Sequence, residues 1–335
     1  MKVTDFDFSL PENLIAKRPL KERSCSRLLV IHRTGRLEHK VFSDLPAYIE
    51  EGDILLINNT KVFPARLHGF KKNGAKIEIL LVRKKGDKEW EVLSKGNFTG
   101  HVKISEELQV ELYKGSSAQF RYSGDFMDMI WKHGNMPIPP YIKRTPDESD
   151  KKTYQTVFAK KDGSIAAPTA GLHFTDTLIK QIASKGIKIR ELTLHVGIGT
   201  FRPIRTERVD EHSMESEHFE IDKGIISEIR ETKALGKRII SVGTTTTRAI
   251  EGYMSGICNV SSHNGRLTGS TDIFIYPGYS FSAVDSLITN FHLPRSTPLM
   301  LTSALTGREN LIKAYKEAVA LGYRFLSYGD AMLIL

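Results

Sequence analysis

The strongest constraint on the fold of this chain is a change of hydrophobic pattern near residue 150. From about residue 60 to 150, short alternating runs such as KIEILLVRK and EWEVLSK are separated by glycine turns. This pattern is typical of a small all-β barrel or sandwich. After residue 150 helical runs end at a glycine and lead into apolar strands, as where Thr175 opens a helix that stops at Gly186 before IKIRELTLHV. The second pattern predicts an α/β domain.

The first 59 residues fit the second pattern better than the first. RLLVIHRTGRLEHKVF predicts a hairpin that turns at Thr34-Gly35, and EGDILLINNT predicts a further strand. A chain of 335 residues also exceeds the usual size of one core, which favours two domains. We therefore expect an α/β domain built from residues 1–59 and 151–335, interrupted by an inserted β-barrel domain at 60–150. The proline-rich PIPPYIKR is expected to be the strap between them.

The chain is basic, with a formal net charge of +9 and an isoelectric point near 9.3. Residues 60–150 hold 16 Lys and Arg against 12 Asp and Glu, a net charge of +4. This balance favours a polyanionic partner such as RNA, although basic proteins without such a partner are common. Its two cysteines are far apart, which excludes a disulfide framework and a thiolate metal site. No run reaches the ~20 apolar residues of a membrane span, and the opening MKVTDFDFSL is no leader, so we expect a cytoplasmic protein with no membrane contact.

Two groups of polar and small residues follow expected strands in the first half of segment 151–335 of the α/β domain. In GSIAAPTAGLHFT the small residues let a ligand approach the backbone, and His173 lies beside them. An ordinary turn with a capping histidine gives the same pattern. In TLHVGIGTF a strand ends at His195, and glycines at 197 and 199 allow a tight turn. That motif lacks the third glycine of a dinucleotide-binding loop, so a standard Rossmann site is excluded.

Three more groups follow. EHSMESEH, at 211–218, can exchange protons or bind a cation, but its spacing matches no standard metal signature and a solvated loop is the alternative. VGTTTTR presents hydroxyls and amides to a carboxylate, phosphate or ribose, unless it is only a threonine-rich helix cap. TDIFIYPGY begins a buried-looking strand at Asp272, and TNFHLPRST combines amide and aromatic groups that can hold a nucleobase, though such aromatics are more often core residues.

These segments together resemble the S-adenosylmethionine:tRNA ribosyltransferase-isomerase family of queuosine biosynthesis. The resemblance covers almost the whole chain, through PIPPYIKR, YQTVFA, GSIAAPTAGLHFT, TLHVGIGTF, GTTTTR, TDIFIYPGYSF and TNFHLPRST. It implies an enzyme that moves the ribosyl part of S-adenosylmethionine onto 7-aminomethyl-7-deazaguanine at the tRNA wobble position. The products would be epoxyqueuosine, adenine and methionine, and the implied fold is an α/β domain with an inserted β-barrel. One position departs from the family pattern H-x-M-H-x-E, because Glu215 replaces the second histidine while Glu217 keeps the acidic place.

The implied reaction needs a base and an acid. For proton transfer we expect His173, His195 and His212 first, because a pKa near ~6.5 suits both directions, and Glu217 and Asp272 second. Arg248 with Gly243 to Thr245 is expected to hold a carboxylate or phosphate, and Asn290 with Phe291 a base. The substrate-binding candidates are Tyr154, Gln155, Thr156, Pro168, Thr169, Gly171, Gly197, Gly199, Thr200, Gly243, Thr244, Thr245, Arg248, Asn290, Phe291 and His292.

The expected partners are S-adenosylmethionine, consumed as a co-substrate, and, from the resemblance, tRNA of the GUN anticodon type. No metal and no true cofactor are expected, and the resemblance favours a monomer. Candidate tRNA contacts are Lys71, Lys72, Lys84, Lys85 and Arg144, with a solvated basic face as the alternative.

Two other functions remain open on the sequence. An S-adenosylmethionine-dependent RNA methyltransferase would normally show a glycine-rich loop after its first strand, and nothing before residue 60 supplies one. A non-catalytic RNA-binding protein would fit the charge, but it leaves His173, His195 and His212 without a function.

Overall fold

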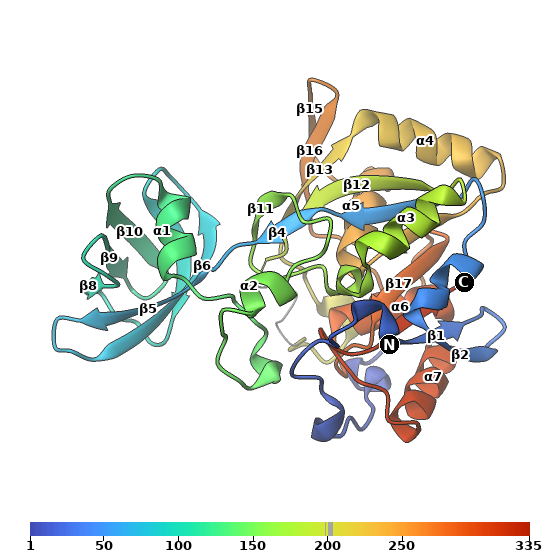
Figure 1. Ribbon diagram of the computed structural model, residues 1–335, viewed down its shortest axis with the longest axis horizontal. Helices are drawn as coiled ribbons and strands as arrows, with labels where there is room; N and C mark the ends of the chain where they lie inside the picture. Colours follow the sequence, from blue (N-terminus) through green and yellow to red (C-terminus); the bar gives the residue numbers. More distant parts are fainter. Residues whose placement is uncertain (198, 200–203) are drawn as a thin grey trace.

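The computed structural model of the protein describes residues 1–197, 199 and 204–335. Figure 1 shows a small β-barrel beside a larger α/β domain, joined by a narrow connection. The α-helices are α1 (Phe126–His133), α2 (Asp150–Thr153), α3 (Asp176–Ser184), α4 (Lys223–Ala234), α5 (Thr244–Met254), α6 (Thr297–Thr306) and α7 (Arg308–Ala320). The predicted combination of an α/β domain with a barrel-like all-β domain is therefore confirmed.

The larger domain is built on a ten-stranded mixed sheet in the order β15-β16-β13-β12-β3-β14-β17-β18-β1-β2. Its strands are β1 (Arg27–Ile31), β2 (Leu37–Val41), β3 (Ile54–Asn58), β12 (Lys188–Leu194), β13 (Glu217–Asp222), β14 (Ile239–Val242), β15 (Val260–His263), β16 (Arg266–Thr271), β17 (Ser286–Asn290) and β18 (Ala331–Ile334). The four central strands β12, β3, β14 and β17 run parallel. The predicted hairpin is β1 and β2, and these strands and β3 bring the first segment of the chain into the sheet.

Helices cover both faces of this sheet, which explains the continuous apolar runs of its inner strands. In β1, Leu28 and Val30 pack with α3 and the 3-10 helix η4 (Phe42–Ala47), whereas Leu29 and Ile31 pack with α6 and α7 on the other face. The same alternation places one side of β3 against α3 and the other against α4 and α5. Each strand residue thus belongs to one of two cores, as the period of two of a β-strand requires.

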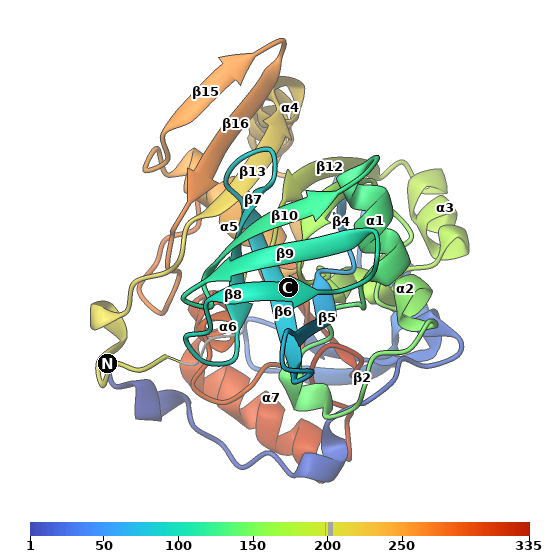
Figure 2. The ribbon, with the colours of Figure 1, turned by 90° about the vertical axis from the view of Figure 1, so that its left-hand side faces the viewer.

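The second domain is a closed antiparallel barrel in the order β10-β7-β6-β5-β8-β9, seen from its own side in Figure 2. Its strands are β5 (Arg66–Lys71), β6 (Lys76–Lys84), β7 (Glu89–Ser94), β8 (Gly100–Lys103), β9 (Leu108–Tyr113) and β10 (Ser117–Tyr122). Phe126 and Ile130 of α1 pack into the barrel core. The exact domain boundaries at residues 60 and 150 stay a prediction.

A two-stranded parallel ladder of β4 (Thr60–Val62) and β11 (Lys161–Ser164) lies where the chain leaves and re-enters the larger domain. The proline-rich strap follows the barrel, and its Met136, Ile138 and Ile142 pack with Tyr154 and Tyr328 of the larger domain. Among the described helices none is both long and apolar enough to cross a membrane.

Candidate active site

A cavity of about 290 Å³ lies at the carboxyl edge of the central parallel strands. The carboxyl ends of neighbouring parallel strands meet at one edge of a sheet, where α/β proteins bind ligands. The segments that follow β11, β12, β14 and β17 all reach this cavity. It is lined by Tyr141, Ala166 to Ala170, Val196, Gly243 to Thr245, Thr289 to Ser296, Pro298, Leu326 and Ser327. Four of the five groups predicted from the sequence therefore share one cavity, in which the predicted Pro168 and Thr169 form part of the wall.

The VGTTTTR motif forms the start of α5, at the cavity wall. Gly243 precedes the helix with φ +90°, a conformation that side-chain-bearing residues rarely adopt, and no side chain caps the helix. Thr244 and Thr245 line the cavity, whereas Thr246 donates its hydroxyl hydrogen bond to the carbonyl of Val242 at 2.6 Å. The alternative of a threonine-rich cap is therefore wrong. The first amides of an α-helix have no acceptor within the helix, so those of Thr244 and Thr245 can bind a negatively charged group.

One turn further along α5, Arg248 forms a buried ion pair with Glu217. Its Nε donates to the carbonyl of Ile273 at 3.2 Å, and its Nη1 donates to Glu217 Oε2. Its Nη2 is buried without a partner among the described residues. Arg248 and Met214 line a small pocket that shares Thr244 and Thr245 with the main cavity. An unused guanidinium N–H group beside a helix N-terminus is suited to a carboxylate or a phosphate.

Asn290, the last residue of β17, is linked to the interior of the domain through His173. The structure has His173 in the 3-10 helix η6 (Thr169–His173), with its ring stacked on Phe42 at 5.0 Å between centroids. His173 Nε2 is 3.0 Å from Asn290 Nδ2, and His173 Nδ1 is 2.7 Å from Ser26 Oγ. Both ring nitrogens therefore have protein partners. The alternative of a helix-capping histidine is wrong, because Thr175 caps the following helix α3.

Burial, with smaller contributions from the charges of Arg324 and Arg23, lowers the pKa of His173 to about 3. The unfolded chain takes up a proton near pH ~6.5, whereas the folded chain takes it up only near pH 3, so stability falls as the pH drops between these values. The slope from this residue is about 1.4 kcal/mol per pH unit. We expect the dependence of stability on pH, measured by urea unfolding below pH 6.5, to be smaller by about this amount in His173→Gln than in the wild type.

The matched control for this pH measurement is His263→Gln, because His263 is exposed on β15. That variant should keep the full slope of the wild type. An unchanged slope in His173→Gln would mean that His173 is not buried in its neutral form.

The other predicted proton-transfer residues lie away from the main cavity. His195 Nδ1 is 2.9 Å from Thr60 Oγ1, and its ring stacks on His218; burial, with a smaller contribution from His218, lowers its pKa. His212 packs edge-on against Phe274 at 5.0 Å between centroids, and burial lowers its pKa. His195 and His212 are therefore not among the residues that line the main cavity.

Asp272 does not begin a strand, so that prediction is wrong. β16 ends at Thr271, Asp272 is exposed, and the residues after it pair with no other strand of the described chain. Ile273 and Ile275 are nevertheless buried, because they pack into the core beside α6 and α7. The alternation of buried and exposed residues here comes from packing against the core and not from pairing with another strand.

Several predicted substrate-binding residues hold the surrounding chain instead of lining the cavity. Gln155 accepts a hydrogen bond from the amide of Val62 at 3.1 Å and donates to its carbonyl. Tyr154 is fully buried beside the strap, and Thr156 is also buried. A Cβ at Gly171 would lie 2.6 Å from the Phe158 ring, so this glycine allows close packing.

The predicted pair Phe291 and His292 is divided between the core and the cavity. Phe291 lines part of the wall, but its ring packs with Tyr315, Tyr323 and Phe325. His292 lines the wall, its Nε2 lies 2.9 Å from Thr289 Oγ1, and burial lowers its pKa to about 3. His292 is therefore a neutral ring at the cavity surface.

In the motif TLHVGIGTF, the amide of Gly197 donates to Glu217 Oε1 at 3.0 Å, which links this turn to the Arg248 ion pair. Gly199 lies against Glu215, since a Cβ there would be 3.0 Å from the Glu215 Cβ. Thr200 lies outside the described residues.

Tyr141 and Ser327 are among the cavity residues that were not predicted. Tyr141 comes from the strap, and its hydroxyl is 2.6 Å from Ser327 Oγ, which precedes β18. Burial raises the pKa of Tyr141 to about 12, so its hydroxyl stays protonated at neutral pH. Tyr141 belongs to PIPPYIKR, so the motif itself was the available signal, but its proline content indicated only a strap.

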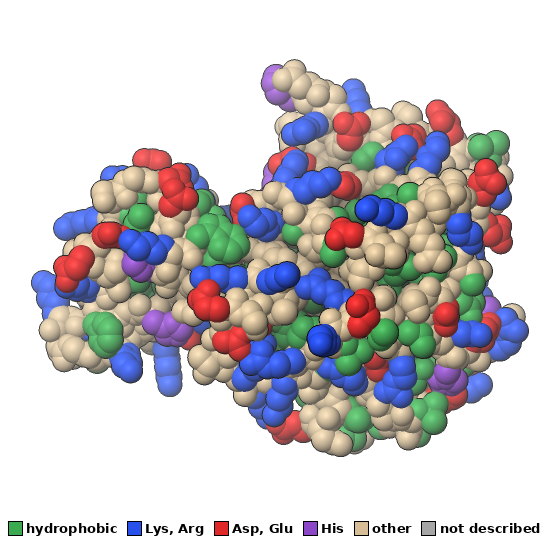
Figure 3. Space-filling view, viewed as in Figure 1, with side chains coloured by type: hydrophobic (Ala, Val, Ile, Leu, Met, Phe, Trp, Pro, Cys, Tyr) green, Lys and Arg blue, Asp and Glu red, His purple; other side chains and the backbone are tan. Residues whose placement is uncertain are grey.

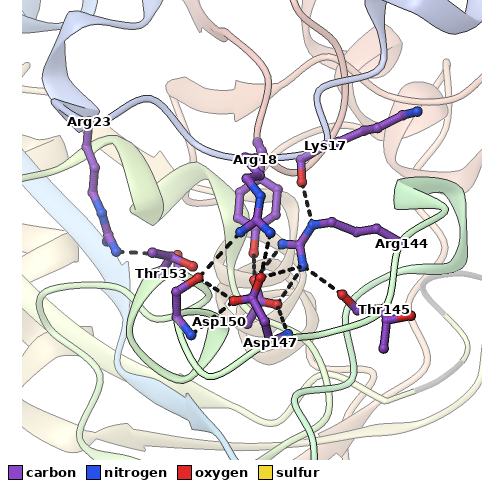
Figure 4. Close-up of polar contacts among 10 residues, drawn as sticks. Lys17, Arg18, Arg23, Arg144, Thr145, Asp147, Asp150 and Thr153 are labelled. Atoms are coloured by element: carbon purple, nitrogen blue, oxygen red, sulfur yellow. Dashed lines mark hydrogen bonds and ion pairs between the residues drawn. The ribbon is translucent and has the colours of Figure 1, made fainter.

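The strap is fastened to the larger domain by the ion pair of Arg144 with Asp150 (Figure 4). Asp150 is fully buried and accepts from both terminal nitrogens of Arg144, at 2.6 and 2.7 Å. Arg144 also donates to the carbonyls of Lys17 and Thr145. The Arg144 guanidinium thus has a structural partner, and its predicted contact with tRNA is not tested.

The four predicted tRNA-binding lysines lie on the barrel. Lys72, Lys84 and Lys85 are exposed, and the Lys71 ammonium lies over the Phe98 ring at 4.1 Å. Lys84 also lines a cavity of about 670 Å³ whose wall includes Gly163 of the larger domain. Figure 3 shows Lys and Arg side chains, mixed with acidic ones, where the barrel meets the larger domain.

In the described part of the chain no group of three or more His, Cys, Asp or Glu side chains is arranged to hold a metal ion. The polar groups at the main cavity are backbone amides, hydroxyls, one amide side chain, one neutral imidazole and Arg295, which pairs with Asp7. The Arg248 guanidinium lies in the adjoining pocket. Such a set can bind a polar organic molecule with a negatively charged end.

Comparisons with known proteins place relatives across the full length of this chain. A family model described as "Queuosine biosynthesis protein" matches residues 3–334. The S-adenosylmethionine:tRNA ribosyltransferase-isomerases of Thermodesulfovibrio yellowstonii and Halothermothrix orenii are 54% and 50% identical to this chain. Each match covers 100% of this chain and 100% of the relative. A crystal structure of S-adenosylmethionine tRNA ribosyltransferase from Thermotoga maritima is 36% identical and covers 99% of this chain and 100% of its own, with a TM-score of 0.57.

Proposed function

Because this chain belongs to the queuosine biosynthesis protein family, we propose that its cavity carries out the ribosyl transfer and isomerisation that its relatives' name describes. The protein is an enzyme, a transferase and isomerase that acts on tRNA with S-adenosylmethionine. It moves the ribosyl group onto 7-aminomethyl-7-deazaguanine at the wobble position, forms epoxyqueuosine, and releases adenine and methionine.

The observation that carries this function is the match of the whole chain to relatives that share one name, at 47–54% identity. The cavity supports it, because the motifs shared with that family converge there from four strand ends. A non-catalytic RNA-binding protein would not require such convergence.

For the methionine end of S-adenosylmethionine, we propose binding at the start of α5. The carboxylate would accept from the free amides of Thr244 and Thr245 and from Nη2 of Arg248, which is buried without a partner among the described residues. This arrangement supplies N–H donors to the carboxylate, while the charge of Arg248 is balanced by Glu217.

The chemistry requires a proton to leave the ribose carbon beside the sulfonium and an acid to assist the departure of adenine. The substrate amine then attacks, a carbon–carbon bond closes the new ring, and an alkoxide forms the epoxide by expelling neutral methionine. His173, His195, His212, Glu217 and Asp272 remain the predicted proton-transfer residues. We add His292 to them, because it lines the cavity as a neutral ring.

For the nucleic acid, we propose a tRNA of the GUN anticodon type, bound by a monomer in the cytoplasm. The exposed Lys72, Lys84 and Lys85 of the barrel support contacts with phosphates, because such contacts are made by flexible, solvated cations. S-adenosylmethionine would be consumed as a substrate, with no other cofactor.

The test is to incubate the purified protein with S-adenosylmethionine and tRNA carrying the aminomethyl-deazaguanine, and to analyse nucleosides and small products by mass spectrometry. Epoxyqueuosine with adenine and methionine is the expected result. S-adenosylhomocysteine with a methylated nucleoside would indicate a methyltransferase instead, and tRNA binding without turnover would indicate a binding protein.

A further inference from the structure

We propose that Ser26, His173 and Asn290 form a positioning chain that turns the Asn290 carbonyl oxygen toward the cavity, where it accepts a hydrogen bond from the exocyclic amino group of a purine-type base. The inference rests on the proposed function, because that function supplies two such bases. One is the adenine of S-adenosylmethionine, and the other is the deazaguanine of the tRNA.

The orientation of the Asn290 amide follows from its neighbours. Its Nδ2 lies 3.3 Å from the carbonyl oxygen of Leu326, which can only accept a hydrogen bond. The opposite amide orientation would bring two oxygens together there. The same Nδ2 lies 3.0 Å from His173 Nε2, which must then be the unprotonated ring nitrogen.

Ser26 is the hydrogen-bond partner of the other ring nitrogen of the histidine. With Nε2 accepting from Asn290, the ring proton is on Nδ1 and is donated to Ser26 Oγ at 2.7 Å. Ser26 follows the 3-10 helix η3 (Arg23–Cys25), and Arg23 ties that segment to the backbone before β11 by donating to the carbonyl of Gln155 at 2.7 Å. The orientation of Asn290 is therefore set from outside the cavity.

The atom left over by these contacts is Asn290 Oδ1. Asn290 is 2% exposed and lines the cavity, and its Oδ1 is buried without a hydrogen-bond partner among the described residues. An acceptor that is buried without a partner is costly to the folded protein, so it is retained where a ligand supplies the donor. The surrounding wall of Ala166, Ala167, Leu293 and Leu326 is apolar, as suits the faces of a flat ring.

The chemistry of the missing partner follows from the acceptor. An unprotonated ring nitrogen or a carbonyl of a base cannot donate to Oδ1. An exocyclic amino group can, and in the deazaguanine the ring N1–H beside it can also donate. This single bond would distinguish adenine from the same ring without its amino group, because removal of the donor leaves Oδ1 unsatisfied. Asn290 is thus a specificity-determining residue, and His173 and Ser26 act through it.

The experiment measures binding without turnover, by calorimetry with adenine and with unsubstituted purine. The wild type should bind adenine about tenfold more tightly than purine, as expected for one buried hydrogen bond. Asn290→Ala should lose this preference. His173→Phe keeps the ring on Phe42 but removes one of the two acceptors of Asn290 Nδ2, so that only the longer contact with the Leu326 carbonyl holds the amide and the preference should fall several-fold. His173→Gln keeps an acceptor and should retain most of the preference.

A second arm uses tRNA that carries the aminomethyl-deazaguanine, compared with tRNA whose base lacks the exocyclic amino group. If Asn290→Ala loses the adenine preference, the base is adenine; if it loses only the tRNA preference, the base is the deazaguanine. If it changes neither, the proposal is overturned. Equal behaviour of His173→Phe and the wild type would overturn the positioning chain.

Unfolding midpoints establish that each variant is folded at the temperature of these measurements. The two proposals fail separately. A wild-type protein that releases no adenine from S-adenosylmethionine in the presence of its tRNA would contradict the proposed function, whereas the adenine preference is measured in binding alone.

Discussion

Replacing Arg248 with methionine is expected to destabilise the fold by about 3–5 kcal/mol, because it removes one member of the buried ion pair between Arg248 and Glu217. Glu217 and Arg248 are 4% and 6% exposed, so solvent cannot replace the lost partner. The same change removes the guanidinium that we assign to the methionine carboxylate. We therefore expect a loss of activity in addition to the loss of stability, measured by urea unfolding and by adenine release.

A second substitution, at Glu217 in the same chain, separates the loss of activity from the loss of stability. In Glu217→Gln/Arg248→Met the buried charge is gone, and the glutamine oxygen can still accept from the amide of Gly197. The double variant should regain most of the stability. Its KM for S-adenosylmethionine should stay about tenfold or more above the wild-type value, as expected for one charge-assisted hydrogen bond. Activity that returns together with stability would contradict the carboxylate-binding role.

Replacing Asp150 with asparagine is expected to cost about 2–4 kcal/mol, because the fully buried carboxylate accepts from both terminal nitrogens of Arg144 and from the amide of Asp147. The asparagine amide would direct N–H groups at one of these donors. Burial, the largest single effect, raises the pKa of Asp150, but the hydrogen bonds from Arg144 and from the Asp147 amide and the charge of Arg144 together outweigh it, so the pKa is lowered.

The contribution of Asp150 is therefore complete above the unfolded pKa near ~3.9 and is lost as the pH falls through the lower folded value. The stability difference between wild type and Asp150→Asn should stay constant from pH 8 to pH 5. Because Asp150 fastens the strap that carries Tyr141, adenine release should also fall.

The matched control is Asp147→Asn. Asp147 pairs with Arg18 on the surface, where the two side chains are 42% and 55% exposed, and such pairs contribute little. This variant should behave like the wild type in both measurements. If the two substitutions had equal effects, the ion pair of Asp150 with Arg144 would not be what holds the strap in place.

The fold class was predictable because each element carries a local signal. Thr175 caps α3 by accepting from the amide of Leu178, and Gly186 follows that helix with φ +78°. The alternating apolar residues of β6 and β7 point into the barrel core, as their period of two requires. Such signals depend on neighbours within a few residues. The sequence was less informative at Asp272, where burial came from packing and not from strand pairing.

The sequence by itself determined the two kinds of domain, the family, and the strand ends at which polar groups gather. The tertiary structure decided which of those groups share a cavity and which serve the fold. Asn290 and His173 are 117 residues apart, and Ser26 is 147 residues from His173, so no local pattern indicates that they touch. His173 and Arg144 resemble functional residues in the sequence because they are polar and belong to motifs. Only the tertiary structure shows that the ring of His173 contacts Ser26 and Asn290, because these partners are far from it in the sequence.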